Sequence, residues 1–107
     1  MNLKESIQTK PEEFVTLCKN YDVKCLYAFG SSITEEFKED TSDFDLLVEL
    51  NIDDPIKKGE TLLDLWDKLE TFFQRKVDLL TASSIRNPIL KRSIDSSKVL
   101  IYDGKRA

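Results

Sequence analysis

Hydrophobic residues recur along this chain with two different periods, which predict strands in some segments and helices in others. Residues 23–29, 43–50 and 77–81 are short, mainly apolar runs, as expected of buried strands. Residues 59–74 instead repeat large apolar side chains every three or four positions, as an amphipathic helix does. We expect its other face, including Glu70, to be solvated. The stripe predicted to enter the core is Leu62, Leu65, Trp66, Leu69, Phe72 and Phe73.

Weaker signals predict the remaining elements. Thr9 followed by Glu12 resembles a capping box, so a helix should begin there. Its buried side should contain Phe14, Leu17, Cys18 and Tyr21. Residues 88–97 predict a short helix with Ile89, Leu90 and Ile94, residues 98–102 a last strand, and residues 104–107 a frayed tail. The order α-β-β-α-β-α-β predicts an α+β fold in which helices pack against one mixed sheet.

Size and composition indicate one soluble globular domain over residues 1–107. The chain has 40% hydrophobic and 34% charged residues, a globular rather than a disordered composition. Its net charge of −4 argues against nucleic acid as a partner, because nucleic-acid-binding surfaces are basic. The absence of histidine argues against zinc, and Cys18 and Cys25 should be free thiols. No leader or membrane span is visible, so we expect a cytoplasmic protein.

Asp43 and Asp45 open the second predicted strand and are the first candidates for chemistry. Side chains alternate along a strand, so both carboxylates should project to one face while Phe44 and Leu46 point to the other. Two adjacent negative charges repel and are costly to desolvate. A hard cation such as Mg²⁺, bound together with substrate phosphates, would neutralise them. The alternative is a turn whose second Asp merely begins the strand.

Two other segments can complete such a site. Gly30, Ser31 and Ser32 directly follow the first strand, where backbone amides and hydroxyls can approach a phosphate closely; the alternative is an ordinary turn. Asp78 lies inside the third apolar strand, where a carboxylate without a partner is costly. If that strand neighbours the second, Asp78 joins the two other carboxylates. Otherwise it is an edge-strand acid turned to water.

Taken together, these motifs resemble the signature of the minimal nucleotidyltransferases of the DNA polymerase β-like superfamily. The family pattern is Gly-Ser, a spacer usually of ten residues, Asp-x-Asp and a later Asp on a neighbouring strand. Gly30-Ser31, Asp43-Phe44-Asp45 and Asp78 match it in order, and the resemblance covers about residues 22–104. It implies a nucleotidyltransferase fold with a sheet of about four strands, in which the second strand lies between the first and the third.

The chain departs from this pattern after Gly30-Ser31. Eleven residues, 32–42, precede Asp43 instead of ten, and Glu35 and Glu36 stand where many relatives have a basic residue. A triphosphate would therefore lack the cation that many relatives provide at this position. The sequence does not place the basic residues that could assist, which include Lys24, Arg75, Lys76, Arg86 and Lys91.

The resemblance also implies an activity. Asp43, Asp45 and Asp78 would be catalytic and metal-binding, with Mg²⁺ as cofactor, and Gly30, Ser31 and Ser32 would bind the phosphates of a nucleoside triphosphate, expected to be ATP. In the family, small bacterial members act as antitoxins that transfer AMP to a HEPN-domain toxin. Two alternatives stay open. One is a non-catalytic module that neutralises a HEPN protein by contact, and the other is a nucleotidyltransferase that modifies an antibiotic or RNA.

Overall fold

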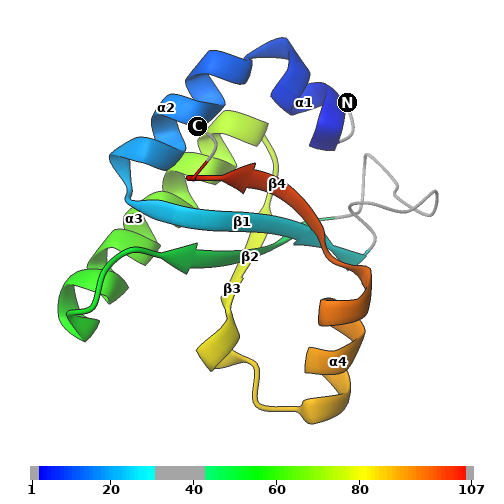
Figure 1. The fold of residues 1–107 in the computed structure, drawn as a ribbon. Coiled ribbons are helices and arrows are strands. Elements are labelled where there is room, and N and C mark those ends of the chain that lie inside the picture. Colours follow the sequence, from blue (N-terminus) through cyan, green and yellow to red (C-terminus); the bar gives the residue numbers. More distant parts are fainter. Residues whose placement is uncertain (1–2, 31–42, 106–107) are drawn as a thin grey trace.

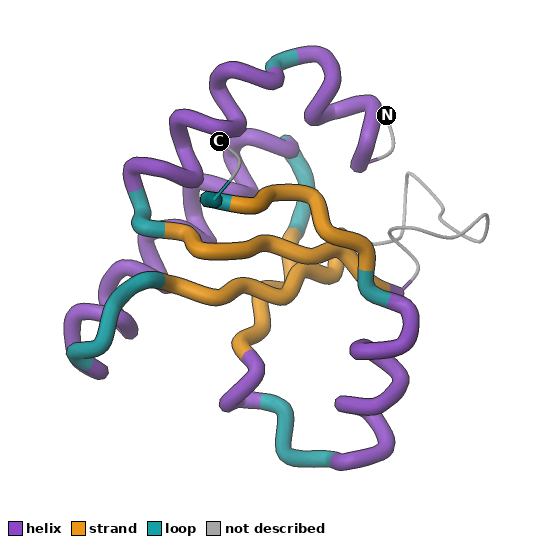
Figure 2. Tube along the Cα trace, viewed as in Figure 1, coloured by secondary structure: helices purple, strands orange, loops and turns teal. Residues whose placement is uncertain are grey.

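The computed structural model describes residues 3–30 and 43–105, arranged as one sheet with helices on both faces (Figure 1). Tracing the chain by element type shows that helices and strands alternate through its second half (Figure 2). The elements are α1 (Leu3–Thr9), α2 (Pro11–Asn20), β1 (Val23–Phe29), β2 (Phe44–Leu50), α3 (Pro55–Phe73), β3 (Val77–Thr81), the 3₁₀ helix η2 (Ala82–Ser84), α4 (Pro88–Ser97) and β4 (Val99–Asp103).

The four strands form one mixed sheet in the order β3-β2-β1-β4. Strand β1 is antiparallel to both β2 and β4, whereas β2 and β3 are parallel. A parallel pair needs a crossover connection, and helix α3 provides it between β2 and β3. The expectations of an α+β fold, a four-stranded mixed sheet and a second strand between the first and third are therefore confirmed.

The two faces of the sheet are packed very differently. Helices α1, α2 and α3 cover one face (Figure 1), and the main core between them includes Phe14, Leu46 and Leu69. All six predicted residues of the α3 stripe belong to or pack against this core. Within residues 3–30 and 43–105, the other face has a smaller buried cluster of Phe29, Leu47 and Ile94, to which α4 contributes. Among the described residues, this face is therefore the more sparsely covered of the two.

Several local predictions were wrong at element boundaries. Thr9 does not cap α2, because it ends the seven-residue helix α1 and its hydroxyl donates to the backbone oxygens of Glu5 (2.8 Å) and Ser6 (2.9 Å). Helix α3 begins at Pro55 rather than residue 59, since the Asp54 carboxylate accepts from the Ile56 amide at 3.3 Å and caps it.

The C-terminal half was predicted more closely, with two differences. Helix α4 spans the predicted residues, but only Ile94 is buried, while Ile89 and Leu90 are 80% and 47% exposed. Gly104 is not frayed, because its amide donates to the backbone oxygen of Lys24 at 2.9 Å.

The cysteines are free, as predicted. Cys18 is fully buried on α2, and burial raises the pKa of its thiol to about 12, which leaves almost no thiolate at neutral pH. Within residues 3–30 and 43–105, no helix has the length and apolar character that crossing a bilayer requires.

Candidate active site

Two of the three candidate carboxylates are direct neighbours in the sheet. Asp45 on β2 and Asp78 on β3 occupy the same register position of the parallel pair, and neighbouring strands lie about 4.7–4.9 Å apart. Asp43 immediately precedes β2. Asp43 and Asp45 are half-buried, whereas Asp78 is exposed on an edge strand. Asp78 thus combines both sequence-based expectations, since it joins the carboxylates and also faces water.

The strand alternation that predicted the direction of the pair is also observed. Phe44, Leu46 and Val48 are buried in the core under α1–α3. Leu47, two positions from Asp45, belongs to the cluster on the opposite face. Because side chains two positions apart share a face, Asp45 projects to the sparsely covered side of the sheet.

Electrostatics links the three acids. The pKa of Asp45 is raised, first by burial and then by the negative charges of Asp78 and Asp43. Both effects disfavour the ionised carboxylate. A cation bound between these groups would relieve the repulsion, so the same arrangement favours cation binding.

Gly30 lies beside Asp45, directly after the neighbouring strand β1. Phe29 pairs with Asp45 across β1 and β2, and Gly30 follows with φ of +65°, a conformation that favours glycine. A Cβ atom at this position would lie 2.6 Å from Asp45 Oδ2. Ser31 and Ser32, the other predicted phosphate ligands, lie outside the described residues. The glycine therefore gives the Asp45 carboxylate the space in which it lies.

Helix α3 holds the start of β3, a role that the sequence did not predict. Trp66 Nε1 donates to the backbone oxygen of Val77 at 2.6 Å, and the Val77 amide donates to Glu70 Oε2 at 3.0 Å. Val77 directly precedes Asp78. The prediction that Glu70 is merely solvated was therefore wrong, although the prediction that Trp66 is a core residue is confirmed. Helical periodicity shows which face a side chain occupies but not that it reaches a strand later in the chain.

Removing this connection should destabilise the fold. Glu70→Ala leaves the buried Val77 amide without its acceptor, which should lower the free energy of unfolding by about 1–3 kcal/mol. Glu70→Gln keeps an acceptor and should lose much less. Urea denaturation measures the difference, and Glu60→Ala on an exposed position of the same helix is the matched control. An equal loss in Glu70→Ala and Glu60→Ala would show that the contact contributes nothing.

The carboxylates could hold a divalent metal only together with other ligands, such as water and substrate phosphates. Among the described residues, no three His, Cys, Asp or Glu side chains form a group that could hold a metal ion by themselves. Mg²⁺ commonly takes one or two carboxylates, with water and substrate phosphates filling its other positions. Asp45 and Asp78, with Asp43 close by, are a donor set of this kind.

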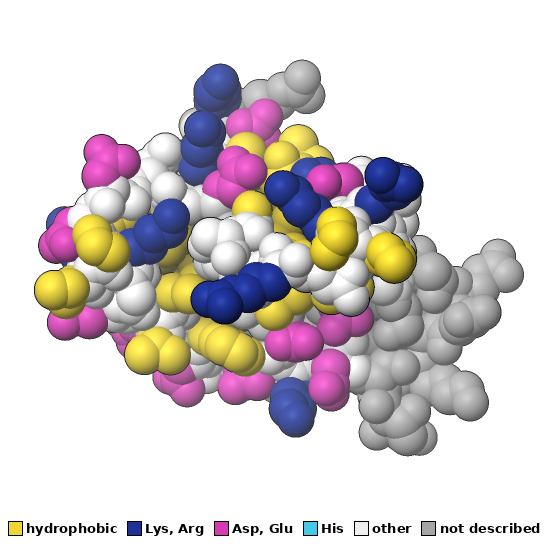
Figure 3. All heavy atoms as spheres, turned by 90° about the horizontal axis from the view of Figure 1, so that it is seen from below, with side chains coloured by type: hydrophobic (Ala, Val, Ile, Leu, Met, Phe, Trp, Pro, Cys, Tyr) yellow, Lys and Arg dark blue, Asp and Glu magenta, His cyan; other side chains and the backbone are white. Residues whose placement is uncertain are grey.

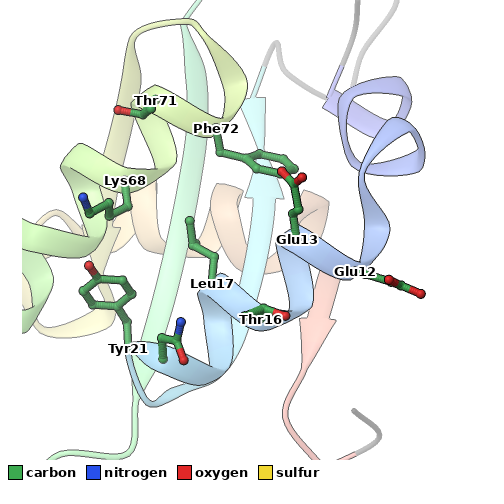
Figure 4. A pocket seen from close by; sticks show the side chains of 9 residues that line it. Glu12, Glu13, Thr16, Leu17, Tyr21, Lys68, Thr71 and Phe72 are labelled. Carbon is green, nitrogen blue, oxygen red and sulfur yellow. The ribbon is translucent and has the colours of Figure 1, made fainter.

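A groove of about 570 Å³ lies elsewhere, between α2 and α3. Figure 4 shows Leu17 and Phe72 within it and Glu12, Glu13 and Lys68 around it. It lies on the helical layer, whereas Asp45 projects from the opposite face of the sheet. The groove is therefore separate from the candidate active site.

Comparison with known proteins identifies the family. Residues 12–107 match the sequence model described as "Polymerase beta, Nucleotidyltransferase". The chain is 40% identical over 79% of its length to "Putative protein adenylyltransferase MJ1217" of Methanocaldococcus jannaschii, covering 83% of that protein. It is 35% identical over 92% of its length to "Putative protein adenylyltransferase MJ0126" of the same organism, covering 94% of it.

Solved structures share the fold. A "putative minimal nucleotidyltransferase" aligns with a TM-score of 0.64 at 25% identity, over 92% of this chain and 95% of that one. A chain of a toxin–antitoxin structure with AMP-PNP aligns with a TM-score of 0.65 at 19% identity, over 91% of this chain and 76% of that one. A chain of the complex between a tri-AMPylated Shewanella oneidensis HEPN toxin and its MNT antitoxin aligns with a TM-score of 0.53 at 20% identity. The alignment covers 92% of this chain and 74% of that one.

Proposed function

The chain is a nucleotidyltransferase of the polymerase beta family, and we propose that it transfers AMP from ATP, with Mg²⁺, to a hydroxyl group of a partner protein and releases pyrophosphate. The register of Asp45 beside Asp78, at the end of the sheet where Gly30 follows β1, carries the proposal. Nucleotidyl transfer needs positioning of the triphosphate and neutralisation of charge more than covalent help. A metal ion held by these carboxylates would offer the neutralisation, and the backbone at Gly30 would help to position the phosphates.

The proposed roles of the site residues in the transfer reaction follow from their positions. Asp43 and Asp45 would hold the metal against the triphosphate, with Asp78 completing the carboxylate set. Bound Mg²⁺ would neutralise phosphate charge and activate the attacking hydroxyl. Gly30, with Ser31 and Ser32, would bind the phosphates. Asp78, the exposed acid, is suited to orient the acceptor hydroxyl and take its proton.

Asp78→Asn tests this division. If Asp78 serves the transfer step, the variant should lower turnover at least a hundredfold while ATP affinity falls only a fewfold. Single-turnover kinetics together with a titration of ATP separate the two effects. Asp53→Asn, an exposed acid outside the site, should behave as wild type. Transfer by Asp78→Asn at the wild-type rate would remove this residue from the mechanism.

A HEPN-domain protein is the proposed acceptor. The support is that the relatives at 35–40% identity are named protein adenylyltransferases and that a structural neighbour is an MNT antitoxin bound to an AMPylated HEPN toxin. We place the acceptor on a separate protein because Asp78 opens to solvent at the edge of the sheet.

The experiment that tests the proposal uses the HEPN-domain protein that we expect to be encoded beside this chain. It is incubated with the chain, Mg²⁺ and each nucleoside triphosphate, labelled in turn at the α- and the γ-phosphate. The expected result is label on the partner from α-labelled ATP alone, and no label when EDTA is present from the start. Tight complex formation without label would favour neutralisation by contact, and label on a small hydroxyl compound or RNA instead would favour the other alternative.

A further inference from the structure

The groove between α2 and α3 has an apolar floor and takes no part in the proposed reaction. The half-buried side chains of Leu17 and Phe72 line it (Figure 4). A second hollow, of about 470 Å³, shares Glu12 and Thr16 with the groove and adds Val15 of the same helix. Covering apolar surface of this kind releases water and is favourable. The outer surface of the helical layer can therefore hold a protruding apolar side chain.

The α2 side of the groove is acidic. Glu12 and Glu13, in the first turn of α2, stand at its rim (Figure 4). The nearby cation on this side is Lys10, whose Nζ lies 4.0 Å from Glu13 Oε2, with both side chains more than half exposed. An exposed pair at this distance contributes little, so both carboxylates remain available to a ligand.

The α3 side adds further negative charge. Burial, a hydrogen bond to Asp64 and the negative charges of Asp64 and Asp67 raise the pKa of Tyr21, which lines the groove. Lys68 is the cation that lines the groove from α3. Acidic side chains therefore outnumber basic ones around the groove, and it favours a ligand that is apolar and cationic.

The N-terminal end of α4 combines these two properties on the other side of the sheet. It is the part of α4 that lies farthest from the sheet (Figure 1), and Ile89 and Leu90 are exposed on it. Residues 86–92, which we call the α4 tip, are all exposed and contain Arg86, Lys91 and Arg92 but no acidic residue. Figure 3, which views this side of the molecule, shows hydrophobic side chains beside Lys and Arg side chains.

The other large apolar side chains that are exposed in the described structure match the groove less well. Leu63 on α3 has three acidic residues and no basic residue within four positions, and an acidic groove would repel them. Ile56 has acidic and basic residues in equal number within three positions. Val99 and Leu100 belong to strand β4 rather than to a protruding end. The α4 tip is therefore the best complement of the groove.

We propose that this chain associates head to tail with a second copy of itself, whose α4 tip occupies the groove between α2 and α3. Ile89 would cover the apolar floor, with Lys91 and Arg92 against the acidic rim. Because the two surfaces are different and lie on opposite sides of the sheet, each chain can bind one copy through each surface. The surfaces are small, so the association should be weak and sensitive to salt. Neither surface contains a residue of the candidate active site, so the inference is independent of the proposed function.

Analytical ultracentrifugation of the full chain, without nucleotide or partner protein, tests the proposal. The weight-average mass of wild type should rise between about 10 µM and about 1 mM, the range of a weak interface, and rise less at high salt. Ile89→Ser replaces a side chain that is 80% exposed, so it should fold normally but weaken the association about tenfold. Ile56→Ser makes the same change at a position that is 73% exposed and should associate as wild type does.

Charge reversal identifies the two surfaces. One variant, Glu12→Lys with Glu13→Lys, reverses the groove, and a second, Lys91→Glu with Arg92→Glu, reverses the α4 tip. Each alone should associate at least tenfold more weakly than wild type, because like charges then face each other. An equal mixture of the two should associate about as strongly as wild type, because each reversed surface meets its complement in the other variant. A thermal melt checks that both variants are folded.

A wild-type chain that stays monomeric over this concentration range would overturn the inference. Equal association of Ile89→Ser and Ile56→Ser would also overturn it, as would a mixture of folded reversed variants that associates no better than either alone. If wild type is monomeric but reversal of the groove weakens binding of the acceptor protein, the groove belongs to that partner, and the inference is again overturned.

Discussion

The double variant Asp43→Asn, Asp45→Asn should lose Mg²⁺-dependent ATP binding and all measurable AMP transfer while remaining folded. The two amides keep the size of the side chains but remove the charges that hold a hard cation. Burial, Asp78 and Asp43 all raise the pKa of Asp45, so this ionised carboxylate opposes folding at pH values above its ordinary pKa. Replacing it should therefore leave the thermal midpoint unchanged or slightly higher at neutral pH.

Calorimetric titration of ATP with and without Mg²⁺, and a thermal melt of each protein, measure the two effects separately. A matched control is Asp53→Asn, Asp54→Asn, which removes two charges at the N-terminus of α3, away from the sheet face that carries Asp45. Asp54 caps α3, but Asn caps a helix about as well as Asp, so this control should change the thermal midpoint little and preserve ATP binding. Loss of folding in the site variant, with ATP affinity unchanged in the protein that remains folded, would show that the pair is structural.

Gly30→Val should abolish nucleotide binding by a different route. The new Cβ would lie 2.6 Å from Asp45 Oδ2, too close for a real contact, and a φ of +65° is strained for valine. The carboxylate or the end of β1 must move, and either movement disturbs the site where backbone amides would approach the phosphates. We expect at least a hundredfold weaker ATP binding and a measurable loss of stability.

Gly59 provides the matched control, because a Cβ at that position would meet no atom within 4 Å. It lies inside α3, where valine is tolerated somewhat better than glycine, so Gly59→Val should bind ATP as wild type does. Titration of ATP and a urea melt of both variants make the comparison. Wild-type ATP affinity in Gly30→Val would remove this glycine from the site.

The sequence predicted the fold best where local patterns repeat. The period of α3 identified its buried stripe, and the helix predicted over residues 88–97 has the observed bounds of α4. Helix α1 was missed because seven residues are too few to show a period. The start of α3 was misplaced because Gly59 was taken as a boundary, although Asp54 and Pro55 form a helix start.

The site was predictable only in part, for a physical reason. Strand alternation was enough to direct Asp43 and Asp45 away from the main core. The neighbouring position of Asp78 followed from the family resemblance, because no local pattern encodes strand order. The role of Glu70 was missed because its contact with Val77 joins segments that only the folded sheet brings together. Side-chain contacts of this kind leave no signal in hydrophobic periodicity.

The intact mass of the HEPN-domain partner, before and after incubation with ATP, Mg²⁺ and this chain, shows whether AMP is transferred to it. We expect the partner to gain the mass of one or more adenylyl groups (AMP less water) with wild type and to gain nothing with Asp43→Asn, Asp45→Asn. An unchanged mass in a stable, stoichiometric complex with the wild-type chain would contradict it, because the chain would then act on its partner by contact alone.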